Sequence, residues 1–311
     1  MFSTVFHALA PVFLTIVVGA LLRRLRFLPA DFFAGLNHLA FWVCLPCLLF
    51  LEISRCPIAG GAALQTIGLV ALAMPPTLLV AWLLTRLLRV PPVSRSAFLQ
   101  GAIRGNLAYI GIPVIAYALA GNPKASALAA LIMAPLTPLY NVVSVMLLAP
   151  RHPAGTFWQR WRPTLAAILT NPLILACLAG LAAFWWHITL PTAVTRTVAM
   201  LGSAGLPAAL LALGASLQFE RLREQFLPAS AAALTRVVIG PLIGLGLIAW
   251  FGLTGECRTI AMLYLACPTA VASYVMADRM GADKELASAI VVLSTVYAFP
   301  VMAGVLILIN R

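Results

Sequence analysis

The sequence contains few charged residues, and acidic ones are the scarcest. Only 9% of its 311 residues are charged, with 8 Asp and Glu against 20 Lys and Arg, whereas 63% are hydrophobic. A soluble globular domain usually has about a quarter of its residues charged. The composition therefore argues against a chain that folds mainly in water and indicates a protein with most of its surface in lipid.

The sequence also lacks the clusters that metal centres and common catalytic sites need. Four histidines are scattered along the chain, and most of the six cysteines lie inside apolar runs without acidic or histidine partners. Cys44 and Cys47 have C-x-x-C spacing, but they lie mid-run and outside any thioredoxin-like pattern. No H-E-x-x-H, G-x-S-x-G or Gly-rich phosphate loop occurs. We therefore expect no cofactor, no metal and no enzymatic activity.

What the chain has instead is a series of long hydrophobic runs. Crossing a bilayer takes about 20 apolar residues, and we identify ten runs of about this length separated by short polar breaks. They predict an all-α polytopic membrane protein with ten transmembrane helices. The runs cover residues 2–22, 36–53, 62–88, 97–120, 125–149, 163–187, 192–217, 228–251, 257–277 and 286–309.

The basic residues lie mostly in the gaps between these runs. Nucleic-acid-binding proteins collect basic residues on one solvated face, which is not the distribution here. The net charge of +12 is therefore interpreted as a sign of membrane topology, and no nucleic-acid partner is expected. Gaps after the odd-numbered runs contain thirteen Lys and Arg, and the opposite side contains five. The richer side should face the cytoplasm. We expect a multi-pass protein of a bacterial inner membrane with both termini outside.

Pairs of prolines and glycines recur at a nearly constant offset. The sequence is therefore interpreted as two five-span halves, 1–150 and 163–311, joined by a short basic cytoplasmic linker at 151–162. Because five is odd, the second half enters the membrane inverted, an architecture typical of secondary transporters. The matches at offsets of 161 and 160 residues are Pro11 with Pro172, Gly19 with Gly180, Leu45-Pro46 with Leu206-Pro207, Gly121 with Gly281, and Lys124 with Lys284.

Helix breakers lie near the middle of the fourth and ninth predicted spans. The fourth contains G-N-L-A-Y-I-G-I-P, ending at Pro113, and the ninth contains L-A-C-P-T-A, with Pro268 in it. Proline removes a backbone donor and clashes with the preceding turn. Paired broken helices of this kind form the midplane binding sites of secondary transporters.

If each span unwinds, we expect the second half-helix to begin at Pro113 and at Pro268, because proline is favoured in a first helical turn. Two half-helix N-termini would then point at one place, and each carries about half a positive charge. Such a site favours an anion, for example a carboxylate. The neighbouring polar groups are Asn106, Tyr109, Thr269 and Ser273.

Two arginines lie within predicted spans. Arg104 stands about one turn before the first break. It either grips a substrate carboxylate bidentately or extends to the cytoplasmic interface. Arg236 is interpreted as extending to the interface or making a helix-helix contact. Thr137, Asn141 and Ser144 of the fifth span either face a cavity or join helices.

Taken together, these stretches resemble the auxin efflux carrier family, which includes the plant PIN-FORMED carriers and many bacterial transporters. The resemblance covers both membrane halves. The long cytoplasmic loop of the plant carriers is replaced by 151–162. The stretches that carry the resemblance are 106–113 in the fourth span, 266–278 with the polar turn 279–284 in the ninth, and 37–46 in the second.

The resemblance implies a ten-helix fold with two crossed, broken helices. Spans one, two, six and seven would form a scaffold that dimerises, and spans three to five and eight to ten a transport domain that moves by an elevator-like step. Relatives carry organic anions, including auxin, malate and malonate. Residues implied at the substrate are Asn106, Tyr109, Ile112, Pro113, Pro268, Thr269 and Ala270, with Asn37, Leu45 and Pro46 from the scaffold.

Two rival functions remain open. Sodium-coupled bile-acid and carboxylate symporters share the crossed-helix architecture, and their sodium sites commonly use acidic side chains near the crossover. Residues 259–276 contain none, which favours uncoupled or proton-linked transport, although backbone carbonyls alone can hold sodium. A receptor that recognises the ligand without moving it is the rival of another class.

Overall fold

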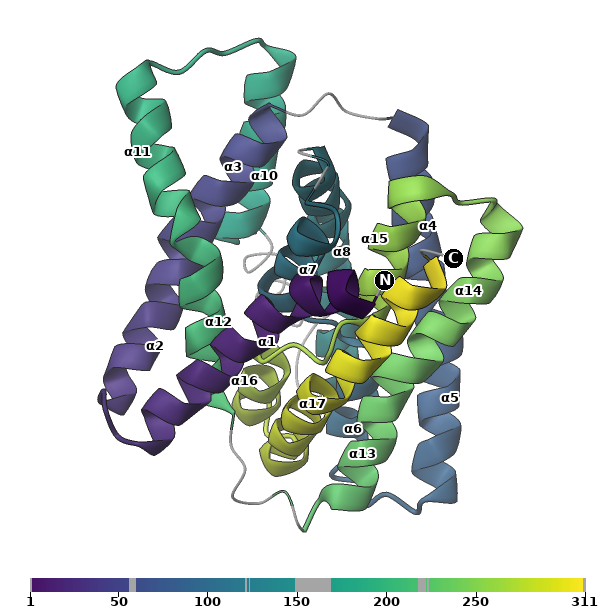
Figure 1. The fold of residues 1–311 in the computed structure, drawn as a ribbon. Coiled ribbons are helices and arrows are strands. Elements are labelled where there is room, and N and C mark those ends of the chain that lie inside the picture. Colours follow the sequence, from purple (N-terminus) through teal and green to yellow (C-terminus); the bar gives the residue numbers. More distant parts are fainter. Residues whose placement is uncertain are drawn as a thin grey trace, which may run out of the picture.

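The structure is a computed structural model in which all regular secondary structure of the described residues is helical, without a strand (Figure 1). The predicted linker at 151–162 lies outside this part of the chain. The described residues are 2–55, 60–120, 122, 124–148, 169–217, 222 and 224–309.

Residues of the first half form helices that follow the predicted apolar runs. Three of the segments, labelled η, are short π-helical turns that continue directly into the next helix. In chain order the elements are α1 (Phe2–Arg24), α2 (Ala30–Leu39), η1 (Ala40–Cys44), α3 (Leu45–Ser54), α4 (Gly60–Leu72), α5 (Met74–Leu87), α6 (Arg95–Ile103), η2 (Leu107–Gly111), α7 (Ile112–Ala118) and α8 (Lys124–Leu148).

The remaining described residues are also helical. Its elements are α10 (Pro172–Trp185), α11 (Thr192–Ser203), α12 (Gly205–Ser216), α13 (Phe226–Leu234), η3 (Thr235–Ile239), α14 (Gly240–Phe251), α15 (Gly255–Ala266), α16 (Ala272–Arg279) and α17 (Lys284–Ile309).

Six helical stretches of the described chain are long and apolar enough to cross a membrane, and two shorter apolar helices accompany them. This confirms the prediction of an all-helical protein and indicates several passes through a bilayer. The long stretches are Asp31–Ser54, Gly61–Leu87, Lys124–Leu148, Thr192–Ser216, Phe226–Phe251 and Lys284–Ile309, and the shorter ones are Leu107–Ala118 and Pro172–Trp185.

Each π-helical turn lies directly before a proline in the next helical segment. Pro46, Pro113 and Pro241 are the second residues of α3, α7 and α14, which follow η1, η2 and η3. A proline inside a helix cannot donate to the carbonyl four residues earlier, and its ring pushes that carbonyl away. A local widening to a π turn accommodates the misfit and bends the helix.

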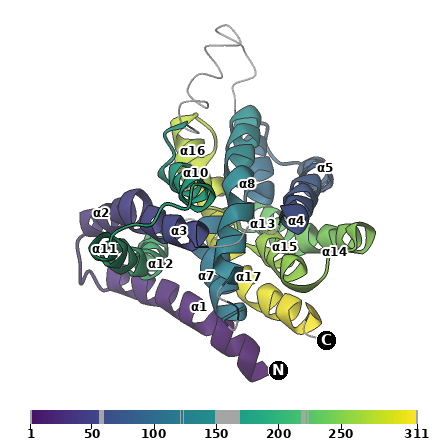
Figure 2. The ribbon, with the colours of Figure 1, turned by 90° about the horizontal axis from the view of Figure 1, so that it is seen from above.

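The helices pack in two groups (Figures 1 and 2). The first group comprises α1, the α2–α3 helix, α10 and the α11–α12 helix, in which α1 packs on α12 and α3 on α10 and α11. The second group comprises α4, α5, α6, α13, α14, α15 and α17, with α13 against α17 and α4 against α15. Helix α8 contacts members of both groups, and it lies between them together with α7 in both views.

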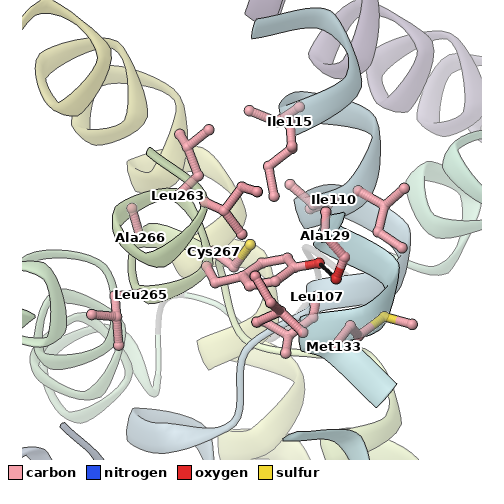
Figure 3. Packing of buried hydrophobic residues seen from close by; sticks show 14 of the residues in the cluster. Leu107, Ile110, Ile115, Ala129, Met133, Leu263, Leu265, Ala266 and Cys267 are labelled. Carbon is pink, nitrogen blue, oxygen red and sulfur yellow. Dashed lines mark hydrogen bonds between the residues drawn. The ribbon is translucent and has the colours of Figure 1, made fainter. Parts of the chain in front are cut away.

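Apolar packing surrounds the region where the fourth and ninth predicted spans meet. Leu107 and Ile110 belong to the same buried cluster as Leu263 and Cys267 (Figure 3). The hydroxyl of Tyr264 donates a 2.6 Å hydrogen bond to the carbonyl of Ala129 in α8. This core fixes α8 beside the two interrupted helices.

Candidate functional site

Two helices are interrupted where the fourth and ninth spans were predicted to break. Helix α6 ends at Ile103 and the next helical turn starts at Leu107. Helix α15 ends at Ala266, and α16 starts at Ala272. The two interruptions lie side by side, since Gly105 and Thr269 form an isolated antiparallel bridge.

Backbone amides and carbonyls that lose their helical partners at one break form hydrogen bonds with the backbone of the other break. The amide of Asn106 donates to the carbonyl of Pro268 at 2.8 Å, and the amide of Ala270 donates to the carbonyl of Arg104 at 3.0 Å. Unpaired backbone groups are costly away from water. The pairing explains how two helices can both be broken inside an apolar protein.

Side chains reinforce this crossing. The Thr269 hydroxyl donates to the carbonyl of Gly101 at 2.7 Å, and the Thr269 amide donates to the Ser294 hydroxyl at 3.0 Å. Asn106 acts as an N-cap, because its side-chain oxygen accepts a 3.3 Å hydrogen bond from the amide of Tyr109. Asn106 and Thr269 therefore hold the backbone as well as standing near the site.

The structure corrects where the second half-helices begin. Helix resumes at Leu107, and Pro113 lies within the continuous helical stretch Leu107–Ala118. Pro268 lies inside the second break, ahead of α16. The Asn106 cap and the hydrogen bonds between the breaks set the restart of the first helix, whereas Pro113 is accommodated by the π turn before it.

A cavity of about 600 Å³ opens beside the two breaks. Its walls come from α2 and η1, from the middle of α8, from the start of α10 and from both interrupted segments. Small-molecule sites commonly measure about 300–1,000 Å³. The lining includes Asn37, His38, Phe41, Trp42, Arg104, Asn106, Tyr109, Thr137, Tyr140, Asn141, Asn171, Ala270, Val271 and Met276.

Arg104 brings a positive charge to this cavity. Its side chain is 8% exposed. The guanidinium donates to the Asn141 side-chain oxygen at 2.7 Å and also contacts the sulfur of Met276. Among the described residues no Asp or Glu forms an ion pair with Arg104. The side chain is therefore held inside the protein and not at an interface, and its charge has no acidic partner there.

Helix starts face the same space. Asn106–Tyr109 at the start of the Leu107–Ala118 stretch and Ala270–Ala272 at the start of α16 all line the cavity. The positive ends of the two helix dipoles thus add to the charge of Arg104. An anion, and a carboxylate in particular, fits this electrostatic setting better than a cation or a neutral molecule.

A hydrogen bond connects the first helix group to the interrupted fourth span across the cavity. The hydroxyl of Tyr109, which follows the first break, donates to the side-chain oxygen of Asn37 in α2 at 2.8 Å. His38 and Trp42 extend the same wall, with their rings 5.8 Å apart. A bound molecule would therefore touch the interrupted helices on one side and α2 on the other.

Not all the predicted site residues line the cavity. Asn37, Arg104, Asn106, Tyr109 and Ala270 do so. The other seven lie elsewhere: Ile112 and Leu45 are buried in the apolar core, Thr269 and Ser273 are buried at the crossing and in α16, Pro268 lies in the second break, and Pro46 and Pro113 lie in the first turns of α3 and α7.

Sequence reasoning missed several lining residues. His38, Phe41 and Trp42 recur with Asn37 at helical spacing on one face of the second span, and this periodicity could have pointed to them. Asn171 also lines the cavity, and it caps α10 by accepting hydrogen bonds from two backbone amides. Met276 carried no signal in the sequence.

The sequence is similar to those of known membrane transport proteins. A family model described as "Membrane transport protein" matches residues 4–306. A Rhizobium meliloti (strain 1021) protein named "Putative malonate transporter" is 27% identical over 318 residues, covering 96% of this chain and 94% of that protein.

Plant carriers match a smaller part of the chain. "Probable auxin efflux carrier component 5c" of Oryza sativa subsp. japonica is 28% identical over 47% of this chain and 41% of its own length. "Auxin efflux carrier component 1" of Arabidopsis thaliana is 27% identical over 43% of this chain and 22% of its own length. The chain thus aligns with less than half of either plant protein.

Apolar helices, two paired breaks and a cavity beside them are the features of a membrane transport protein. The family consists of transporters, which supports the expectation that the chain is not an enzyme. The chain belongs to the auxin efflux carrier family of membrane transport proteins.

Proposed function

We propose that the protein is a secondary transporter that carries a small organic carboxylate across the inner membrane. The observation that carries this proposal is the Arg104 guanidinium in a cavity that two helix N-termini also face. A buried cation is costly unless it is paired. A substrate carboxylate would supply the missing partner and could bind both guanidinium nitrogens at once.

The substrate class in this proposal is a small dicarboxylate, and malonate is the first compound to test. Its support is the name of the bacterial relative, which aligns over nearly the whole of both chains. One carboxylate would bind Arg104 and the helix N-termini. The second would lie toward the polar groups Asn37, His38 and Asn171 on the other wall.

The proposed mechanism is alternating access of the elevator type. It includes ten spans in two inverted halves, 1–150 and 163–311, with spans one, two, six and seven as a dimeric scaffold. The helix contacts support this division, because the helices of those four spans pack on one another and form the first group. The cavity lies where this group meets the interrupted helices. A sliding step would then exchange the Tyr109–Asn37 hydrogen bond for other contacts.

Thermal unfolding of the detergent-purified protein tests ligand binding. Malonate, malate, succinate, indole-3-acetate and taurocholate are added singly, with sodium or choline as the cation. A ligand that binds only the folded state raises the unfolding midpoint by mass action. We expect a rise with a dicarboxylate, and counterflow of the same labelled anion in proteoliposomes. Binding without any counterflow would instead indicate a receptor.

Arg104→Gln is the variant that tests the site. We expect about 10- to 100-fold weaker anion binding, because hydrogen bonds to a charged group contribute about 1.5–3 kcal/mol. The unfolding midpoint without ligand should be retained, since removing an unpaired buried charge relieves a desolvation cost. Arg196→Gln on the exposed face of α11 is the matched control. Wild-type affinity in Arg104→Gln would contradict the proposed site.

A further inference from the structure

A second buried arginine lies behind the crossing of the broken helices. Arg236 belongs to η3 in the second helix group, and its side chain is 2% exposed. Sequence reasoning placed this side chain at the membrane interface or in a helix contact. The structure agrees with the second interpretation: the side chain extends into the protein, contacts another helix, and is the largest of the fully buried side chains in the described chain.

Arg236 contacts both interrupted helices. One of its terminal nitrogens, Nη2, donates a 2.7 Å hydrogen bond to the carbonyl of Tyr264, in the last turn of α15. The same nitrogen lies against the backbone of Gly105 in the first break, where a β-carbon would be only 2.1 Å away. The guanidinium thus occupies the space beside Gly105, and a larger residue at this position would require the Arg236 side chain to shift.

The position of Arg236 complements that of Arg104. Gly105 lines the cavity, whereas Arg236 lies behind it and is not part of the lining. Tyr140, which also lines the cavity, neighbours Arg236 on the α8 side. The guanidinium of Arg104 thus faces the cavity, and the guanidinium of Arg236 lies on the other side of the backbone where the two breaks meet.

No Asp or Glu of the described residues forms an ion pair with Arg236. Its partner is a carbonyl at the C-terminal end of an interrupted helix, which carries partial negative charge. In secondary transporters, the C-terminal ends and freed carbonyls of broken helices are where a coupling cation such as sodium binds. At the end of α15, the positively charged side chain of Arg236 occupies the position at which such a cation would bind.

We infer that Arg236 is a resident cation at the point where the two broken helices cross. Its side chain holds the two breaks against each other. Its positive charge, next to the anion site, takes the place of the charge that a bound sodium ion would otherwise supply. This inference rests on the proposed anion transport and extends it to the coupling ion. It assigns Arg236 a positioning and electrostatic role without contact to substrate. Anion binding should consequently need no sodium.

The wild-type protein provides the first test. Affinity for malonate and initial counterflow rates are measured with sodium, potassium or choline as the only cation at equal ionic strength. Within error, we expect equal affinity and equal rates in all three salts. Binding or counterflow that requires sodium would overturn the inference while leaving anion transport established. Absence of anion binding and counterflow in every salt, for every compound of the panel, would overturn the proposed function itself.

Two substitutions separate charge from structure. Arg236→Gln keeps an amide donor for the Tyr264 carbonyl but removes the charge, and Arg236→Lys keeps the charge. We expect about tenfold weaker malonate binding in Arg236→Gln, because a nearby charge in a partly desolvated site contributes strongly to anion affinity. Arg236→Lys should remain closer to the wild type, and Arg196→Gln on exposed α11 is the control for loss of a positive charge.

A purely structural role would lower the unfolding midpoint of both Arg236 variants without separating their affinities for malonate. Equal affinities in the two variants would therefore overturn the electrostatic role, as would wild-type affinity in Arg236→Gln. If Arg236→Gln does not fold, the wild-type measurements in sodium, potassium and choline still test the inference. A requirement for sodium would contradict it, because Arg236 is proposed to take the place of that ion.

Discussion

At the scale of single residues, the site depends on polar side chains that form hydrogen bonds with backbone groups at the two helix breaks. Thr269 joins the second break to α6 through the carbonyl of Gly101 and receives support from Ser294. Asn106 caps the helix that follows the first break. These two residues were predicted as substrate contacts, and the structure adds a structural role for each. Whether they also touch substrate stays a prediction.

Thr269→Val should destabilise the protein by about 1–3 kcal/mol, the usual cost of leaving a buried polar group unsatisfied. Gly101 lies in the last turn of α6, where carbonyls have no further helical partner. Thermal unfolding in detergent measures the effect. Thr269→Ser keeps the hydroxyl and should restore most of the stability.

Thr197→Val serves as the control, because the Thr197 hydroxyl forms an exposed hydrogen bond within α11. Its unfolding midpoint should stay close to the wild-type value. Equal midpoints for Thr269→Val and Thr197→Val would show that the Thr269 hydroxyl does not hold the crossing together.

At the scale of helices, small residues allow the closest contact of the first group. Helix α1 packs against α12, and a β-carbon on Gly214 of α12 would be 1.9 Å from the carbonyl oxygen of Ile16 in α1. Because this neighbour is backbone, it cannot move aside as a side chain can. Close approach of helices through small residues is a common way of packing in membranes.

Gly214→Ala should therefore destabilise the protein by about 1–3 kcal/mol, the typical cost of overpacking. The matched control is Gly246→Ala in α14, where a β-carbon would meet no atom within 4 Å. That substitution should be neutral or stabilising by up to about 1 kcal/mol, since alanine favours helix. The two unfolding midpoints are compared in the same detergent, and an unchanged midpoint in Gly214→Ala would contradict the tight α1–α12 contact.

At the scale of the whole molecule, the distribution of basic residues predicts the orientation in the membrane. Thirteen Lys and Arg on one side against five on the other predict that both termini lie outside. A C-terminal fusion to alkaline phosphatase, which is active only outside the cytoplasm, should be active. A fusion to a fluorescent protein that matures only in the cytoplasm should be dark. The opposite pair of results would reverse the orientation.

Much of the fold was predictable because apolar runs and prolines act locally. Helices of the described chain follow the predicted hydrophobic runs, six helical stretches are long and apolar enough to cross a membrane, and the breaks fall in the two predicted spans. Of the candidate site, Asn37, Arg104, Asn106, Tyr109 and Ala270 line the cavity. Residues such as His38 and Met276 were not predicted, because each lies far in sequence from Arg104 and only packing brings them to the same cavity.

The sequence by itself determined that the chain is helical and apolar, and that two spans are interrupted, since hydrophobicity and helix breaking depend on a residue and its near neighbours. Only the tertiary structure decided where the first of those helices resumes and which way the two buried arginines point. Both outcomes depend on hydrogen bonds between distant segments: Asn106 with Pro268, Arg104 with Asn141, and Arg236 with Tyr264. Such partners are chosen by packing in three dimensions, and no local pattern in the chain encodes them.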